Sequence, residues 1–356
     1  VYDYQLFHWK YNASCSLIFT TYCIQRGGFG IPMLYIDSGG IEKMILSVSR
    51  KTDIPAFHFD WFLQRVKEGY VINRNPMFPL QLYKTPIHPL SCDCIVFWTK
   101  NAIPAIEKLE GLREYQYYFQ YTVTGYDRDI EQNLPDKKWI RENFKALSDQ
   151  IGCMKVIWRY DPILFSAKYT QEWHLQTFGE LASDFGGKTE KCVISFLDPY
   201  YNCTEINKRL GVYFPDGEEL LAFSRRIAAI GKENGITIAS CAEKIDLQEC
   251  GIEHNSCIDK TLIERIVGKP LSLSADKGQR EACGCVQSLD IGTYNTCRNG
   301  CVYCYATKGK GRIEEAFSIK DNSSPILCDR ISERDHMIER KVQSSVSKRY
   351  IKKVIG

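Results

Sequence analysis

The 356-residue sequence has no long uninterrupted apolar run, although 44% of its residues are hydrophobic. A membrane-spanning helix needs about twenty consecutive apolar residues. The nearest candidate, CSLIFTTYCI over residues 15–24, is shorter and contains two threonines. No small-residue cleavage site follows it, as a secretory signal would require. The sequence therefore predicts a cytoplasmic protein without a membrane span.

The sequence also has little excess charge, since 46 Lys and Arg residues stand against 43 Asp and Glu residues. A formal net charge of +3 gives little support to a nucleic-acid partner and does not exclude one. The basic runs KGKGR and KRYIKK lie within residues 308–356. Such runs are typical of a solvated tail and only sometimes form a phosphate-binding patch.

The first 43 residues show neither the alternating nor the helical apolar pattern of a folded element. The chain opens on Val1, and a clear apolar strand pattern first appears at Met44. We therefore expect Met44 to be the natural start and residues 1–43 to be a non-native or disordered leader. A poorly ordered extension of a genuine protein is the alternative.

Six short β-rich apolar runs recur after Met44 and alternate with stretches of helical spacing. They cover residues 44–49, 94–99, 115–123, 154–160, 192–197 and 236–240. Alternating strands and helices favour parallel pairing through right-handed crossovers. We expect an α/β fold in which residues 44–245 form a partial (βα)6 TIM-like barrel. A doubly wound open sheet is the second possibility.

Polar side chains follow each of these runs, at the place where parallel sheets gather their functional residues. Six of them are our candidates for substrate binding: Arg50, Asp53, Lys100, Tyr126, Arg159 and Asp161. Other polar residues at these ends include Asp198, Tyr200, Tyr201, Glu243 and Lys244. Ordinary solvated loops are polar too, so the recurrence at all six ends matters more than any single residue.

The chain is rich in cysteine, with sixteen residues, and eight of them fall between residues 241 and 304. A reducing compartment disfavours disulfides and favours metal binding or catalysis. In the stretch NTCRNGCVYCYA, residues 295–306, Cys297, Cys301 and Cys304 form the pattern CxxxCxxC. Structural zinc usually takes four ligands, whereas three thiolates can hold a 4Fe-4S cluster and leave one iron open.

This motif, with Tyr303 before its last cysteine, resembles the signature of the radical S-adenosylmethionine superfamily and its spore photoproduct lyase-like branch. The resemblance implies a 4Fe-4S cluster whose open iron binds S-adenosylmethionine, with Tyr303 against the adenine. One electron from a reducing donor would then release a 5'-deoxyadenosyl radical, which abstracts hydrogen from a substrate.

The chain from Met44 to about Lys341 resembles more closely an uncharacterised bacterial family, a domain of unknown function with such a cysteine cluster at its C-terminal end. The matching stretches are SVSRKTDIPAF, CIVFWTKN, WRYDPI, CAEKIDL, GIEHNSCIDK, CGCVQSLDIGTYNTCRNGCVYCYA and NSSPIL. One departure from the superfamily is that the cysteine loop follows the sixth strand, not the first. The superfamily's glycine-rich and glutamate motifs are therefore not transferred.

Four further cysteines lie in the matching stretches: Cys241, Cys257, Cys283 and Cys285. They are candidates for a second iron-sulfur cluster or a zinc site, because thiolates are soft ligands. The alternative is that they are buried as small apolar side chains, which is common for free cysteine. We assign Cys250, outside the matching pattern, a structural role.

The sequence thus predicts a radical S-adenosylmethionine enzyme of undefined substrate. It divides into a leader (1–43), a barrel (44–245), a cysteine-rich iron-sulfur segment (246–310) and a tail (311–356). A non-catalytic iron-sulfur or zinc-binding protein is one alternative. A nucleic-acid lesion repair enzyme is another, and it would need a basic groove leading to the cluster.

Overall fold

The computed structural model describes residues 44–198, 204–276, 278, 283–342 and 345. The leader predicted for residues 1–43, the candidates Tyr200 and Tyr201, and most of residues 343–356 lie outside the described residues.

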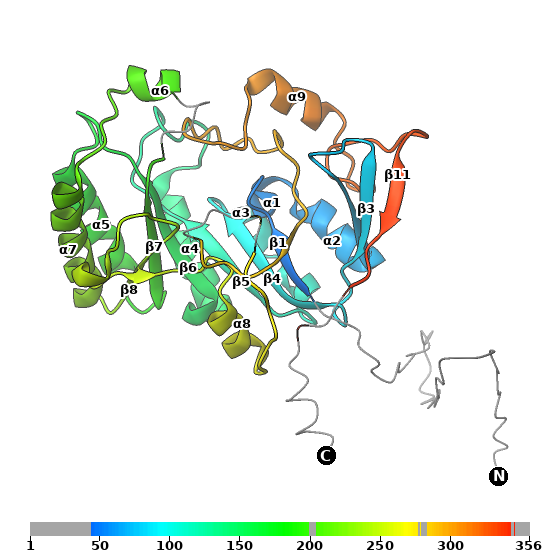
Figure 1. The fold of residues 1–356 in the computed structure, drawn as a ribbon, viewed down its shortest axis with the longest axis horizontal. Coiled ribbons are helices and arrows are strands. Elements are labelled where there is room, and N and C mark those ends of the chain that lie inside the picture. Colours follow the sequence, from blue (N-terminus) through cyan, green and yellow to red (C-terminus); the bar gives the residue numbers. More distant parts are fainter. Residues whose placement is uncertain (1–43, 199–203, 277, 279–282, 343–344, 346–356) are drawn as a thin grey trace, which may run out of the picture. The chain divides into compact units, whose positions relative to one another are not determined.

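An eight-stranded sheet forms the centre of the fold, and every neighbouring pair of strands in it is parallel (Figure 1). In spatial order its strands are β10 (Leu289–Asp290), β1 (Met44–Val48), β4 (Cys92–Thr99), β5 (Tyr117–Thr122), β6 (Val156–Ile163), β7 (Lys191–Phe196), β8 (Thr237–Ser240) and β9 (Glu253–His254). The six longer strands of this set are the six that the sequence predicts.

The strand order from β1 to β9 follows the chain without reversal. The doubly wound alternative would need a reversal of strand order, so it does not describe this sheet. Strands β10 and β9 form the two edges of the sheet. No pairing joins these edges in the described part of the chain, so no closed barrel is present there.

Both faces of the strands are apolar, and helices pack against one of them. They are α1 (Ile54–Phe57), α2 (Phe59–Glu68), α3 (Ile103–Ile106), α4 (Lys137–Ile151), α5 (Gln171–Phe185) and α7 (Gly217–Glu233). Strand residues Phe97, Phe119 and Trp158 share one buried cluster with helix residues Phe144 and Phe178. Side-chain caps begin the long helices: Asp136 for α4, Thr170 for α5 and Asp216 for α7.

The other face of the sheet is covered by residues that the sequence analysis assigned to the cysteine-rich segment. Ile45, Val96 and Tyr118 of the strands form a second buried cluster there. Leu262 and Ile263 of α8 (Lys260–Val267) complete it. The cysteine-rich segment therefore supplies one layer of the central fold.

Several elements were not predicted from the sequence. A small sheet in the order β11-β3-β2 joins β2 (Tyr70–Arg74), β3 (Gln81–Pro86) and β11 (His336–Glu339). The other unpredicted elements are α6 (Thr204–Arg209), α9 (Lys310–Ser318), η2 (Cys153–Lys155) and η4 (Gln248–Cys250), whereas η1 (Leu109–Leu112) lies in one of the stretches of helical spacing. Strand β11 lies in the predicted tail and pairs in parallel with β3. Among the described helices, none is long and apolar enough to cross a membrane.

Candidate functional site

The loop that carries Cys297, Cys301 and Cys304 is docked on the chain that follows β5. Cys301 forms an antiparallel bridge with Glu131. The Val302 amide donates to the Ile130 carbonyl over 3.0 Å. These backbone bonds hold the cysteine loop at the carboxyl end of the parallel sheet, where such sheets place ligands.

Position 300, inside the CxxxCxxC motif, requires glycine because of its backbone conformation and its close packing. Its φ of +70° lies in the left-handed region, and a Cβ there would lie 2.7 Å from Asn133 Nδ2. The Asn133 side chain in turn donates to the Arg298 carbonyl over 2.8 Å. The glycine in the motif therefore has a packing reason.

Asp53, a substrate candidate, connects three segments with both of its carboxylate oxygens. Thr99 Oγ1 donates to Oδ1 over 2.8 Å, and the Lys100 amide donates to Oδ2 over 2.8 Å. Asn299 Nδ2, between the first two cysteines of the motif, donates to Oδ2 over 2.9 Å. Burial raises the pKa of Asp53, and these hydrogen bonds offset only part of that rise. Asp53 thus ties the cysteine loop to the end of β4.

Glu131, which the sequence analysis did not single out, lies at the centre of a buried network. Lys100 Nζ lies 2.7 Å from Oε1, and Lys137 forms an ion pair with Oε2. Tyr303 donates its hydroxyl to Oε1 over 2.6 Å, and Thr124 donates to Oε2 over 3.0 Å. Burial alone would raise the pKa of Glu131, but the two ammonium groups outweigh it and lower the pKa to about 2.

Lys100 and Tyr303, both singled out from the sequence, are brought together by this network. Lys100 Nζ lies 5.5 Å from the centroid of the Tyr303 ring, a cation–π distance. Tyr303 is buried, and its ring also packs near Tyr126 with centroids 6.3 Å apart. Glu131 lies nine residues beyond the end of β5, near other acidic residues, so no sequence pattern marks it.

The thiols of Cys297, Cys301 and Cys304 are partly buried and lie within electrostatic range of one another. Burial, followed by the charge of Asp53, raises the pKa of Cys297 to about 12. Burial also raises the pKa of Cys301 well above its usual range, while the Lys100 ammonium opposes that rise. In the described ranges, no three His, Cys, Asp or Glu side chains are arranged as a metal-binding group.

Arg50 lies at the β1 end, close to a carboxylate on the edge strand β10. Its amide donates to Asp290 Oδ2 over 2.7 Å, and Ser49 Oγ donates to Oδ1 over 2.7 Å. The Arg50 guanidinium donates to Ser288 Oγ over 3.2 Å and lies 5.8 Å from the Trp98 ring centroid. The sequence analysis also missed Asp290, because a two-residue strand has no detectable pattern.

Arg159, which is buried, and Asp161, which is half-buried, form an ion pair within β6. Burial by itself would lower the pKa of Arg159, but the Asp161 carboxylate outweighs it and raises the pKa. The Arg159 guanidinium lies 5.4 Å from the Trp98 ring centroid, so both candidate arginines face the same indole. Its Nη1 also lies 2.9 Å from Cys257 Sγ.

Tyr126 stands apart from the other candidates. Its hydroxyl donates to the Pro162 carbonyl over 2.9 Å and accepts from the Leu164 amide over 2.8 Å. Its ring stacks on Trp173 with centroids 5.8 Å apart. These contacts place Tyr126 in a buried cluster with Tyr303.

The structure also brings together the second group of candidate cysteines. The sulfurs of Cys241 and Cys257 are 2.9 Å apart. Hydrogen bonds from Cys241, Cys285 and Arg159 hold the pKa of Cys257 well below its usual range. A hydrogen bond from Cys285 lowers the pKa of Cys283 to about 6. Cys250 is separate and directs its thiol to the Leu221 carbonyl.

Comparison with known proteins places this chain in one family. A family model described as "Domain of unknown function (DUF1848)" matches residues 45–306. This is most of the chain and includes the cysteine loop, so the protein belongs to the DUF1848 family. No curated protein matches the chain.

Among solved structures, the chain is similar to a crystal structure described as "a putative alpha-L-fucosidase" from Bacteroides thetaiotaomicron. The two sequences are 11% identical, and the match covers 64% of this chain and 83% of that one. The TM-score is 0.22, which is too low to support an argument about fold or activity.

Proposed function

We propose that this protein is a radical S-adenosylmethionine enzyme built on a partial (βα)6 barrel. In this proposal Cys297, Cys301 and Cys304 hold a 4Fe-4S cluster, and its open iron takes the cofactor. The observation that carries the proposal is the position of the three thiols. They lie near one another at the carboxyl end of a parallel sheet, beside the ion pair of Lys100 and Glu131.

The donor chemistry fits an iron-sulfur cluster. Thiolates are the usual ligands of such clusters. Burial raises the pKa of Cys297 and Cys301, and at Cys301 the Lys100 ammonium offsets only part of that rise. Iron would supply the remaining compensation, because metal binding deprotonates a coordinating thiol. The three side chains would converge on the cluster as they ionise.

When bound, the cluster and S-adenosylmethionine together would supply a carbon-centred radical that removes a hydrogen atom from the substrate. The chain's own contribution begins with Lys100, whose ammonium is fixed beside Cys301 by the ion pair with Glu131. A fixed positive charge at this position stabilises an anionic cluster. Tyr303 is oriented by its hydroxyl bond to Glu131 and is assigned the contact with the adenine.

Substrate binding is assigned to Arg50, whose guanidinium lies 5.8 Å from the Trp98 ring centroid and 3.6 Å from Asp276 Oδ2. A guanidinium group beside an indole favours a substrate that carries an anionic group. Arg159 is assigned a structural role, because its guanidinium is paired with Asp161 and contacts Gln120 and Cys257. Asp53 and Tyr126 are assigned structural roles, because their polar atoms are occupied by contacts within the protein.

A non-catalytic iron-sulfur or zinc-binding protein is the second candidate function. The observation in its favour is the four-cysteine group around Cys257, since four is the number of protein ligands that a structural zinc site uses.

Iron content tests the proposal. After anaerobic reconstitution, the wild-type chain should carry about four more irons than a variant with Cys297, Cys301 and Cys304 all replaced by alanine. The matched control is Cys153→Ala, because Cys153 is also partly exposed and lies in η2. Equal iron content in the wild type and the triple variant would reject the proposal.

A further inference from the structure

We propose that Cys241, Cys257, Cys283 and Cys285 form a four-thiolate centre for a thiophilic metal, zinc or iron, separate from the cysteine loop. The proposal goes beyond the proposed function and does not depend on it. The arrangement of the described residues around these thiols supports it.

The four thiols come from three segments that are distant in sequence. Cys241 directly follows β8, and Cys257 lies between β9 and α8. Cys283 and Cys285 precede β10, the strand at the opposite edge of the sheet. The Cys241 and Cys257 sulfurs are 2.9 Å apart, and the Ile258 amide donates to Cys285 Sγ over 3.3 Å. The three segments therefore meet around the sulfur atoms of Cys241, Cys257 and Cys285.

The sulfurs receive N–H donors in the manner of thiolate ligands. Arg159 Nη1 lies 2.9 Å from Cys257 Sγ, and Asn255 Nδ2 donates to the same sulfur over 3.6 Å. A neutral thiol is a weak acceptor, whereas a thiolate accepts charge-assisted hydrogen bonds. Four thiolates around a divalent ion carry net negative charge, which the Arg159 guanidinium partly offsets. Outer hydrogen bonds of this kind are a regular part of metal sites.

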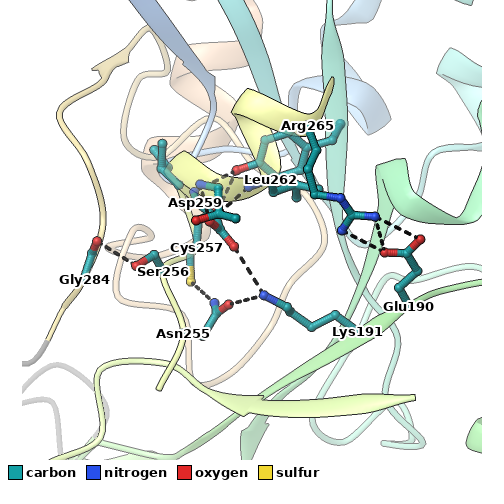
Figure 2. A network of polar contacts seen from close by, with 12 residues as sticks. Glu190, Lys191, Asn255, Ser256, Cys257, Asp259, Leu262, Arg265 and Gly284 are labelled. Carbon is teal, nitrogen blue, oxygen red and sulfur yellow. Dashed lines mark hydrogen bonds and ion pairs between the residues drawn. The ribbon is translucent and has the colours of Figure 1, made fainter. Parts of the chain in front are cut away.

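Cys257 and the Cys283–Cys285 segment are held in direct contact (Figure 2). Ser256 Oγ donates to the Gly284 carbonyl over 2.7 Å. A Cβ at position 284 would lie 2.5 Å from that hydroxyl, so an alanine there would displace the Ser256 side chain.

The loop that carries Cys257 is also anchored to the sheet. Figure 2 shows Lys191 of β7 reaching toward Asn255 and Asp259 on either side of Cys257. The distances are 3.5 Å to Asn255 Oδ1 and 3.3 Å to Asp259 Oδ2. Tyr118 of β5 donates its hydroxyl to the Cys257 carbonyl over 2.8 Å. A metal here would fasten the cysteine-rich segment to the face of the sheet that it covers.

The sulfurs form a chain of contacts and do not surround one point in the described part of the structure. Sulfurs that share a zinc ion at tetrahedral angles lie ~3.8 Å apart. The 2.9 Å pair is also far longer than a disulfide bond of about 2.0 Å. Metal binding therefore requires these two sulfurs to move about 1 Å farther apart, which side-chain rotation allows.

The test measures metal in the variant that lacks Cys297, Cys301 and Cys304, so that failure of the main cluster does not affect the result. Purified without oxygen, this variant should retain about one zinc per chain, or iron with acid-labile sulfide. Either metal supports the site, and elemental analysis decides between them. Adding Cys257→Ser should remove the metal, whereas adding Cys153→Ser should leave it in place.

A second variant guards against misfolding of the Cys257→Ser protein. Gly284→Ala keeps all four thiols but displaces Ser256 from Gly284. It should weaken zinc affinity ten-fold or more in competition with a chromophoric chelator. Metal content unchanged by Cys257→Ser, or metal-free protein with a mass loss matching one disulfide, would overturn the proposal.

Discussion

Two buried carboxylates fix the cysteine loop to the strand ends, and their surroundings differ. Asp53 accepts from neutral groups of Thr99, Lys100 and Asn299, and its pKa is raised by burial. Glu131 faces two ammonium groups, and its pKa is lowered to about 2. Glu131 therefore stays ionised across the physiological range, while Asp53 acts mainly as a hydrogen-bond acceptor.

Replacing Asp53 should destabilise the protein, since Asp53→Ala removes the side-chain cap of α1 and leaves the Thr99, Lys100 and Asn299 donors without their acceptor. We expect a loss of at least about 2 kcal/mol in the free energy of unfolding, measured in urea. Asp60→Ala is the control, because Asp60 is largely exposed in its ion pair with Lys108. Its cost should stay below about 1 kcal/mol. Equal losses in the two variants would contradict the assigned role of Asp53.

Buried His174 makes stability depend on pH. Burial lowers the pKa of His174 to about 4, while its ring nitrogens contact Tyr160 Oη and the Leu164 carbonyl. In the unfolded chain a histidine pKa is about 6.5, so the unfolded state binds the proton first. Stability should therefore fall as the pH drops from about 6.5 to about 4, by at most about 1.4 kcal/mol per pH unit for this residue.

The check compares urea unfolding of the wild type and His174→Gln across that window. The variant should lose less stability on acidification, whatever its stability at neutral pH. His58, whose pKa burial also lowers to about 4, supplies a remaining slope in both proteins. Parallel pH profiles for the two proteins would show that His174 does not take part.

At the scale of elements, the sequence predicts those strands that consist of uninterrupted apolar runs. The strands of the main sheet are buried on both faces, so their apolar runs stand out, and the helical spacing between the runs indicates helices that cover the sheet. The small sheet was missed because β3, QLYKTP, alternates poorly and β11 is exposed along its whole length. Pairing between residues 81–84 and 336–339 depends on tertiary contacts that no local pattern records.

Helix packing on the sheet gives a matched pair of glycine substitutions. A Cβ on Gly231 of α7 would lie 2.4 Å from Ile238 Cδ1 and 2.9 Å from the Ile236 carbonyl. On Gly179 of α5 the nearest atom would be 4.0 Å away. Gly231→Ala should cost about 1–3 kcal/mol through overpacking, measured by urea unfolding. Gly179→Ala should be neutral or stabilise by up to about 1 kcal/mol. A tolerated alanine at position 231 would contradict the close packing of α7 on β8.

At the scale of the whole molecule, the chain order of the sheet explains how C-terminal cysteines reach the ends of N-terminal strands. Strand β10 pairs with β1, so the chain returns across the sheet before the cysteine loop begins. The loop then contacts residues 130–133 beyond β5. The sequence predicts this late position of the cysteine loop, but not the partners Glu131 and Asp290, which lie on an irregular segment and a two-residue strand.

The same path of the chain explains how the cysteines of the second group come together. Strand β9 pairs with β8 at the opposite edge, and the segment that returns to β10 carries Cys257, Cys283 and Cys285 across the covered face. The sequence places these cysteines in one region, and the structure adds the contacts with Arg159 and Ser256.

The central claim is that the cluster held by Cys297, Cys301 and Cys304 leaves one iron free for S-adenosylmethionine. The most direct measurement is the electron paramagnetic resonance spectrum of the reduced, reconstituted protein, recorded with and without S-adenosylmethionine. The account predicts a cluster signal that shifts when the cofactor is added to the wild type, and no such shift in the triple alanine variant. A wild-type spectrum that the cofactor leaves unchanged, or a cofactor-dependent shift that persists in the triple variant, would contradict it.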